Sequence, residues 1–179
     1  MSGHSKWSKV KHKKILTDAK KGKIFSKLAR LITVAARAKG GDPEINPQLR
    51  IAVEKAKQAN MSSENIERAI QRGAGKDKAE ILEEILYEVY GPSGAAILIN
   101  VITDNKNRTL SEIKHILNTY GGKIAEPGSV MWAFEKQGND YVAKYPMQTT
   151  EKDKPVLKNL LNALDEQDDV QEVYTNVNF

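Results

Sequence analysis

The residues of this chain that are best suited to chemistry are lysines, and they crowd the first forty positions. Ten lysines and two arginines stand there against one acid, Asp18, so that segment carries a formal charge of +11. The remaining positions hold 16 basic and 22 acidic residues, a balance of −6. Lysine is a compact point charge that suits phosphate oxygens. The asymmetry therefore predicts a nucleic-acid-binding end rather than a tail that only aids solubility, a role that acidic residues serve better.

The predicted phosphate contacts lie in the N-terminal segment and along the helix expected after it. Trp7 and His12 place flat rings among the lysines, and such rings can stack on bases. The alternative for Trp7 is structural, as an anchor packed against the helical domain. The candidate nucleic-acid-binding residues are Lys6, Trp7, Lys9, Lys11, His12, Lys13, Lys14, Lys20, Lys21, Lys23, Lys27, Arg30 and Arg37.

A second polar segment, Thr103–Thr109 (TDNKNRT), lies between an expected strand and an expected helix. It places amides and bases at a helix N-terminus, where backbone N–H groups and the helix dipole attract anions. The alternative is a polar turn with a helix cap, and the residue types favour that interpretation. The candidate second contact comprises Asn105, Lys106, Asn107 and Arg108.

Other kinds of chemistry lack their residue patterns. The absence of cysteine excludes disulfides, thiol nucleophiles and thiolate metal sites. The three histidines have no zinc-binding spacing, and the acids at 165–169 lack the calcium-loop pattern, so we expect a solvated acidic loop there. No set of serine, histidine and aspartate stands out. We therefore predict a protein that is not an enzyme and that uses no cofactor and no metal.

Composition also bears on location and partners. No apolar run approaches the roughly 18 residues of a membrane span, and the N-terminus has no apolar core of a secretory signal. A chain without cysteine fits a reducing compartment. We therefore expect a soluble, cytoplasmic protein that binds nucleic acid, and neither a membrane nor a small-molecule substrate.

Hydrophobic periodicity predicts the elements that position the basic residues. From about Asp18 to Lys39, apolar residues recur every three or four positions, with a separate basic stripe. Asn46-Pro47 and Ser62 or Ser63 are typical helix starts, whereas Gly40-Gly41 and Gly73 are typical ends. The sequence thus predicts a basic arm over 1–17 and a three-helix domain over 18–75.

The hydrophobic period changes after the helical domain. Ala95–Thr103 is typical of a central strand, and Thr109 with Glu112 resembles a capping box that opens a helix. Further predicted elements are paired strands at 129–136 and 140–147, a helix at 153–164 and a strand at 170–177. This β-α-β-β-α-β order predicts an α+β protein in which residues 79–179 form a ferredoxin-like split βαβ sandwich, preceded by an extra hairpin strand at 84–90.

Several segments, spread nearly from end to end, carry a family resemblance. They are GHSKW (3–7), KHKK (11–14), DAKKGKIFSKLARLITVAA (18–36), GGDPEINPQLR (40–50), NIERAIQRG (65–73), YGPSG (90–94), TDNKNRT (103–109) and DDVQEVYTN (168–176). In these segments the chain resembles the YebC family, whose mitochondrial relatives are translational activators of cytochrome oxidase. The resemblance implies a helical first domain, α/β domains after it, and a role in gene expression.

The resemblance also implies a difference in length and leaves two functions open. Family members usually carry a third α/β domain between the strand ending near Lys136 and Met147, where this chain has ten residues, and we expect a simple hairpin through Gln137–Asn139. The leading functional hypothesis is a DNA-binding transcriptional regulator. The alternative is a ribosome-associated translation factor that binds structured RNA. A diffuse lysine array favours backbone contacts with little sequence choice in either case.

Overall fold

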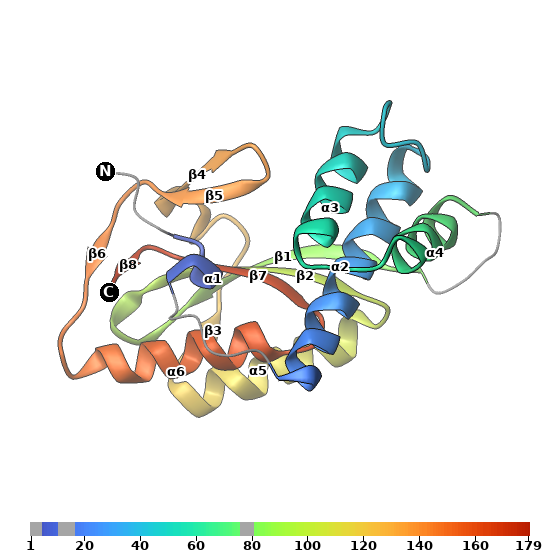
Figure 1. Ribbon diagram of the computed structural model, residues 1–179. Coiled ribbons are helices and arrows are strands. Elements are labelled where there is room, and N and C mark those ends of the chain that lie inside the picture. Colours follow the sequence, from blue (N-terminus) through green and yellow to red (C-terminus); the bar gives the residue numbers. More distant parts are fainter. Residues whose placement is uncertain (1–4, 11–16, 76–80) are drawn as a thin grey trace. The chain divides into compact units, whose positions relative to one another are not determined.

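The computed structural model describes residues 5–10, 17–75 and 81–179, which form two compact units (Figure 1). The helical unit lies between residues 14 and 84. The α/β unit combines residues 5–10 with residues 85–179. Helices followed by a mixed sheet confirm the predicted α+β fold class. The described part of the predicted basic arm, 5–10, is not a separate extended segment, because it folds with the α/β unit.

The described helical unit contains three helices with side-chain caps at their N-termini. They are α2 (Asp18–Lys39), α3 (Pro47–Gln58) and α4 (Ser63–Ala74). Thr17, Asn46 and Ser62 each accept a hydrogen bond from a backbone N–H three residues ahead. Each cap satisfies a donor that the first helical turn would otherwise leave unpaired. The helix starts predicted at Asn46-Pro47 and Ser62 are therefore confirmed.

Small residues let these three helices pack closely. Their shared core is built largely from alanines around Ile32, Leu49 and Ile70. A Cβ atom at Gly73 of α4 would collide with the backbone of α2 at Thr33, so only glycine permits this approach. The hydroxyl of Thr33 hydrogen-bonds to the Ala69 carbonyl across the same contact. The apolar face of α2 is thereby fixed against α4.

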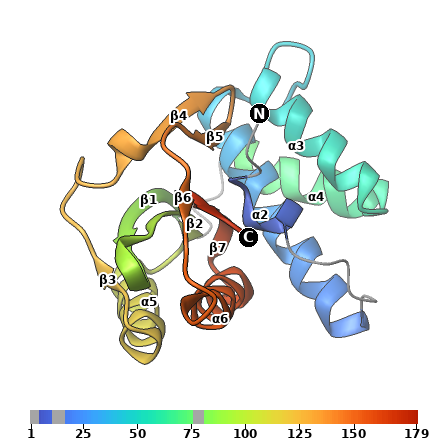
Figure 2. The ribbon, with the colours of Figure 1, turned by 90° about the vertical axis from the view of Figure 1, so that its left-hand side faces the viewer.

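The α/β unit is organised around a four-stranded sheet of order β3-β1-β2-β7. Helices α5 and α6 lie side by side on one face of it (Figures 1 and 2). The sheet, the two helices that cover it and the 3-10 turn between β1 and β2 are, in chain order, β1 (Glu83–Tyr90), η1 (Pro92–Gly94), β2 (Ala96–Thr103), α5 (Lys106–Tyr120), β3 (Lys123–Ile124), α6 (Asp153–Glu166) and β7 (Val170–Thr175). The remaining elements are α1 (Trp7–Val10), η2 (Met131–Ala133), β4 (Phe134–Gln137), β5 (Asp140–Ala143), and the parallel pair β6 (Met147–Gln148) and β8 (Val177–Asn178).

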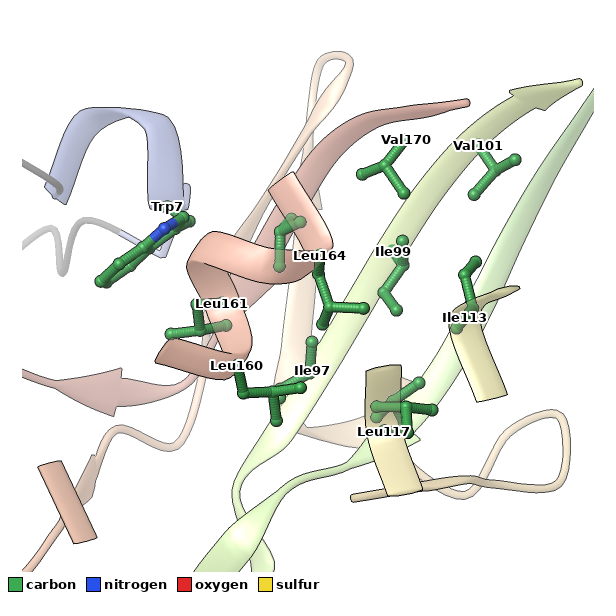
Figure 3. Close-up of a cluster of buried hydrophobic side chains, with 12 residues drawn as sticks. Trp7, Ile97, Ile99, Val101, Ile113, Leu117, Leu160, Leu161, Leu164 and Val170 are labelled. Carbon is green, nitrogen blue, oxygen red and sulfur yellow. The ribbon is translucent and has the colours of Figure 1, made fainter. Parts of the chain in front are cut away.

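Strand β2 is buried on both faces, as its continuous apolar sequence predicts. Its odd-numbered residues Ile97 and Ile99 pack toward α5 and α6 (Figure 3). Its even-numbered residues Ala96 and Leu98 pack on the other face, in a second cluster with Val130 and neighbouring residues. Two separate hydrophobic layers therefore hold this strand in the sheet.

The predicted hairpin is confirmed, but the strand order of the sheet differs from the prediction. Strands β4 and β5 pair in register from Phe134↔Ala143 to Gln137↔Asp140. They form a sheet of their own, and β1, predicted as an extra strand, takes the place beside β2. The reason lies in burial, because three of the four β4 residues are exposed whereas β1 buries Glu88 and Val89. The predicted split βαβ order is corrected accordingly.

The N-terminal segment completes the α/β unit along strand β7. The carbonyl of Ser5 accepts a hydrogen bond of 2.9 Å from the Thr175 N–H. The backbones of Lys6 and Tyr174 form an isolated antiparallel β-bridge. Strand β7 ends the four-stranded sheet, so this pairing covers part of an edge. Helix α1 follows and places Trp7 against Leu161 and Leu164 of α6 (Figure 3).

Candidate nucleic-acid interface

Lys6, the first predicted phosphate contact, is held inside the α/β unit. Its Nζ atom lies 3.0 Å from Asp140 Oδ1 and 3.0 Å from Glu172 Oε1. Burial acts to lower the pKa of Lys6, but the neighbouring charges of Glu172 and Asp140 outweigh it and raise that pKa. The charge of Lys6 is already balanced by two carboxylates, so it is not available to a phosphate. We therefore remove Lys6 from the candidate interface.

Trp7 is a core residue, so the structure does not support a base-stacking role for it. The side chain is 2% exposed, and its indole N–H donates to Asn162 Oδ1 at 3.1 Å. The structural alternative was right about anchoring and wrong about the partner, because Trp7 packs on α6 of the α/β unit and not on the helical domain. Of the other N-terminal candidates, Lys9 is exposed on α1, whereas Lys11, His12, Lys13 and Lys14 lie outside the described residues.

Helix α2 carries the remaining predicted contacts. It holds seven basic residues against one acid, Asp18. Lys20, Lys21 and Lys23 are exposed in its first two turns, Lys27 and Arg30 are half-buried, and Arg37 is exposed near its end. At 100° per residue, the stripe of Lys23, Lys27, Arg30 and Arg37 lies opposite the face that packs on α3 and α4. The predicted division of this helix into an apolar and a basic face thus matches its packing.

The charge of the helical unit is positive as a whole. Its described residues 17–75 include twelve basic and six acidic side chains, whereas residues 81–179 include nine basic and fifteen acidic ones. Helix α2 accounts for this surplus, because α3 and α4 together carry five basic and three acidic residues. A helix with so one-sided a charge attracts a polyanion at long range.

The TDNKNRT segment has the geometry of a turn and a cap. Asn105 is the N-cap of α5, since its side chain accepts from the Arg108 N–H at 3.1 Å. The Arg108 guanidinium lies 2.7 Å from Asp104 and 3.1 Å from Asp169, which already supply its counter-charges. Lys106 and Asn107 are exposed beside it. Of the candidate second contacts, only these two exposed residues remain open to an anion.

Two expectations about this segment and the acidic loop were wrong. Helix α5 begins at Lys106 and not at Thr109, whose hydroxyl is buried 2.6 Å from Asp169 and 2.7 Å from Thr103. Asp169 is accordingly not in a solvated loop, because it is 2% exposed and shared by Arg108, Thr109 and Gln167. Asp169 can be buried because its carboxylate accepts hydrogen bonds from Arg108 and Thr109 at the start of α5.

Glu88 is a structural residue that the sequence pattern did not reveal. Its carboxylate, on β1, accepts backbone N–H groups from Gly128, Val130 and Met131 at 2.5, 2.7 and 2.8 Å. Burial acts to raise the pKa of Glu88, but these three hydrogen bonds outweigh it and lower that pKa. The only sequence signal is an acid inside an otherwise apolar strand, Ile85–Tyr90.

Across 5–10, 17–75 and 81–179, no group of three or more histidine, aspartate or glutamate side chains is arranged to hold a metal ion. In the same part of the chain, no helix combines the length and the apolar character that crossing a membrane requires.

Fold and charge together define a class: an α+β protein with a basic three-helix unit and a separate sheet unit. Residues 5–76 match the family model described as the TACO1/YebC protein N-terminal domain, and residues 82–145 match the one described as the TACO1/YebC second and third domain. A probable transcriptional regulatory protein of Pseudothermotoga lettingae is 40% identical over 236 aligned positions, covering 98% of this chain and 93% of the relative. The chain belongs to the TACO1/YebC family.

A probable transcriptional regulatory protein of Petrotoga mobilis is 56% identical over 138 residues, covering 77% of this chain but 55% of the relative. The chain thus spans little more than half the length of that relative. The crystal structure of a conserved hypothetical protein from Aquifex aeolicus superposes with a TM-score of 0.87 and 35% identity, covering 96% of both chains.

Proposed function

We propose that this protein is a regulator of gene expression that binds nucleic acid through the basic face of α2, and that it acts as a DNA-binding transcriptional regulator. The observation that carries the proposal is the charge of α2, seven basic residues against one acid on a helix whose other face is packed. The names of the relatives, probable transcriptional regulatory proteins, support the regulatory role.

The composition of the basic face favours contact with the phosphate backbone over reading of bases. Sequence readout in the major groove relies mainly on arginine, asparagine and glutamine side chains that reach base edges. The exposed start of α2 presents Lys20, Lys21 and Lys23, which act as point charges. Binding should therefore depend strongly on salt and weakly on sequence. Structured RNA on the ribosome offers the same phosphates, so it is the competing target in the test.

The test removes three charges from the exposed start of α2. We expect Lys20→Ala, Lys21→Ala and Lys23→Ala, combined in one variant, to weaken binding to every duplex sequence by a similar factor. The slope of log K against log salt should flatten by up to about 3 units, since each neutralised phosphate contributes about 0.9. Binding of labelled duplex DNA, an RNA hairpin and intact ribosomes, measured from 50 to about 300 mM salt, gives both quantities.

A matched control carries the same loss of charge on the other unit. Lys114, Lys123 and Lys152 are exposed in the α/β unit, and their triple alanine variant should keep the wild-type affinity and slope. Equal effects of the two variants would show that net charge, and not the face of α2, determines binding. If the wild type binds RNA or ribosomes more tightly than duplex DNA, and the α2 variant loses that binding, the protein acts in translation and not in transcription.

A further inference from the structure

Two exposed aromatic rings lie together on the α/β unit. Trp132 is 59% exposed and Tyr145 is 53% exposed, with ring centroids 5.6 Å apart and planes inclined by 42°. The only other tryptophan of the chain, Trp7, is buried. Large aromatic rings usually bury most of their area, so two adjacent rings left in solvent are typical of a binding surface.

The loop that presents Trp132 is held in place from below. Glu88 accepts the N–H groups of Gly128, Val130 and Met131, directly before the ring. The indole N–H of Trp132 then donates to the Ser129 carbonyl at 2.7 Å, which fixes the orientation of the ring. The Tyr90 hydroxyl donates to the same carbonyl at 2.8 Å. Trp132 is therefore a preorganised surface residue rather than a side chain without a fixed position.

The backbone of Tyr145 is held by a different part of the unit. The Ala133 carbonyl accepts the backbone N–H of Lys144 at 2.8 Å, and that of Tyr145 lies 3.4 Å away. The carbonyl of Tyr145 in turn accepts from Asn176 Nδ2 at 3.1 Å. Because these hydrogen bonds hold the indole of Trp132 and the backbone of Tyr145, binding would cost less conformational entropy than at a loop without them.

The chemistry around the pair indicates which ligand it fits. Lys144 Nζ lies 5.7 Å from the centroid of the Tyr145 ring. The other large exposed hydrophobic side chains described in residues 85–179 are Val156 on α6 and Phe179, both in other segments. The surface is thus two flat rings and a cation, with no other large exposed hydrophobic side chain in the same segment. Flat rings beside a positive charge match a base and its phosphate.

We propose that Trp132 and Tyr145 form a stacking platform for unpaired bases of a single-stranded nucleic acid, with Lys144 meeting a neighbouring phosphate. The inference rests on the proposed function only in the class of ligand. It adds a second contact, on the α/β unit, whose preference for single strands differs from the duplex contact of α2. Stacking is tolerant of sequence because every base has an aromatic face.

The experiment compares single-stranded and duplex binding by the full chain. Labelled oligothymidylate of about 20 nucleotides, a practical length on the scale of known single-strand sites, and a duplex of equal length serve as probes. Trp132→Ala and Tyr145→Ala should each weaken single-strand binding about tenfold, and leave duplex affinity and the salt slope unchanged. Trp132→Leu should lose as much as Trp132→Ala, because leucine keeps apolar volume without an aromatic face.

Tryptophan fluorescence provides a direct readout of stacking. Oligothymidylate should quench the emission of the exposed Trp132 and leave that of the buried Trp7 unchanged. In Trp132→Phe, which keeps a flat ring, binding should largely persist while the quenching disappears. Circular dichroism confirms that each variant is folded, as expected for exposed positions.

Each other outcome overturns a different statement. If duplex binding persists and the Ala variants bind oligothymidylate as tightly as wild type, the platform is wrong and the proposed function stands. If the wild type binds no nucleic acid, both fail. If Trp132→Leu retains single-strand binding, the contact is apolar docking and not stacking. If the substitutions change only the sedimentation of the protein, the rings contact a second copy of this chain and the platform is wrong.

Discussion

At the scale of single residues, Glu88 shows how one carboxylate can organise a loop. It lies on β1, and its two oxygens accept three backbone N–H groups from residues 128–131. A carboxylate with several N–H donors is stabilised in its charged form, although burial opposes that charge. The lowered pKa of Glu88 reflects this balance. The loop conformation therefore depends on the charge of one side chain.

We expect Glu88 to make the stability of the α/β unit dependent on pH. Its folded-state pKa lies below the ordinary value of 4.5, so its contribution is complete above about pH 4.5 and is lost as pH falls through the folded pKa. Urea unfolding at several pH values between 7 and 3 measures this. Glu88→Gln should reduce stability at pH 7 and remove part of the loss on acidification. An unchanged pH profile in that variant would contradict the role.

Lys6 and Trp7 show why residue type alone misled the prediction of the site. A lysine and a tryptophan in a basic segment are typical of nucleic-acid contacts. The partners that bury them, Asp140, Glu172 and Asn162, lie more than 130 positions away in the chain. No local pattern links such distant residues. The exposed rings of Trp132 and Tyr145 were missed for the same reason, because exposure is decided by tertiary packing.

At the scale of elements, Asn46 joins two helices of the helical unit. Its side-chain oxygen accepts the Leu49 N–H and caps α3. Its Nδ2 atom donates to the carbonyls of Ala35 and Gly40 at 2.8 Å each, near the end of α2. Asn46 is fully buried, so unmatched partners would cost free energy. One side-chain amide thus provides hydrogen-bond partners for backbone carbonyls at the end of α2 and for a backbone N–H at the start of α3.

A pair of substitutions distinguishes this double role from capping alone. Asn46→Ala should lower the free energy of unfolding of the helical unit by about 2–3 kcal/mol, from a lost cap and unpaired carbonyls. Asn46→Asp keeps the capping oxygen and loses the donors, so it should cost at least about 2 kcal/mol. Urea unfolding measures both. Ser62→Ala, at a simple cap, should cost about 1 kcal/mol. Wild-type stability of Asn46→Asp would leave capping as the whole role.

Helices and turns were predictable from sequence because their signals are local. The starts at Asn46 and Ser62, the central strand and the short hairpin all follow from nearby residues. The strand order was not predictable in the same way. Strand β3 has two residues and no periodic pattern, yet it pairs with β1 at Val89↔Ile124. Pairing between distant strands is set by what each can bury, which a linear pattern does not contain.

At the scale of the whole molecule, the chain path makes the α/β unit discontinuous. The chain contributes 5–10 to that unit, builds the helical unit, and then returns to complete the sheet. The helical unit is continuous in sequence and has its own core. Its positive charge and the negative balance of residues 81–179 therefore belong to separately folded parts.

The discontinuous path predicts that residues near the N-terminus stabilise a sheet far away in sequence. Trp7→Ala should destabilise the α/β unit by about 3–5 kcal/mol, the usual cost of removing a buried aromatic ring. Hydrogen exchange measured by peptide should show lost protection in β2 and α6 and unchanged protection in α2, α3 and α4. Trp132→Ala, at the exposed tryptophan, is the control and should change neither. Lost protection confined to α2 would contradict the assignment of 5–10 to the α/β unit.

The pairing of Ser5 with Thr175 also bears on how the protein folds during synthesis. The last helix of the helical unit, α4, ends at Ala74, whereas β7 begins at Val170. At about 5–20 residues per second, the ribosome needs roughly 5–20 s to cover that interval. Throughout that interval the core that buries Trp7 is incomplete, although the helical unit, which follows Trp7 in sequence, can already fold. Residues 5–10, the first described residues of the chain, are thus among the last to pack into the folded protein.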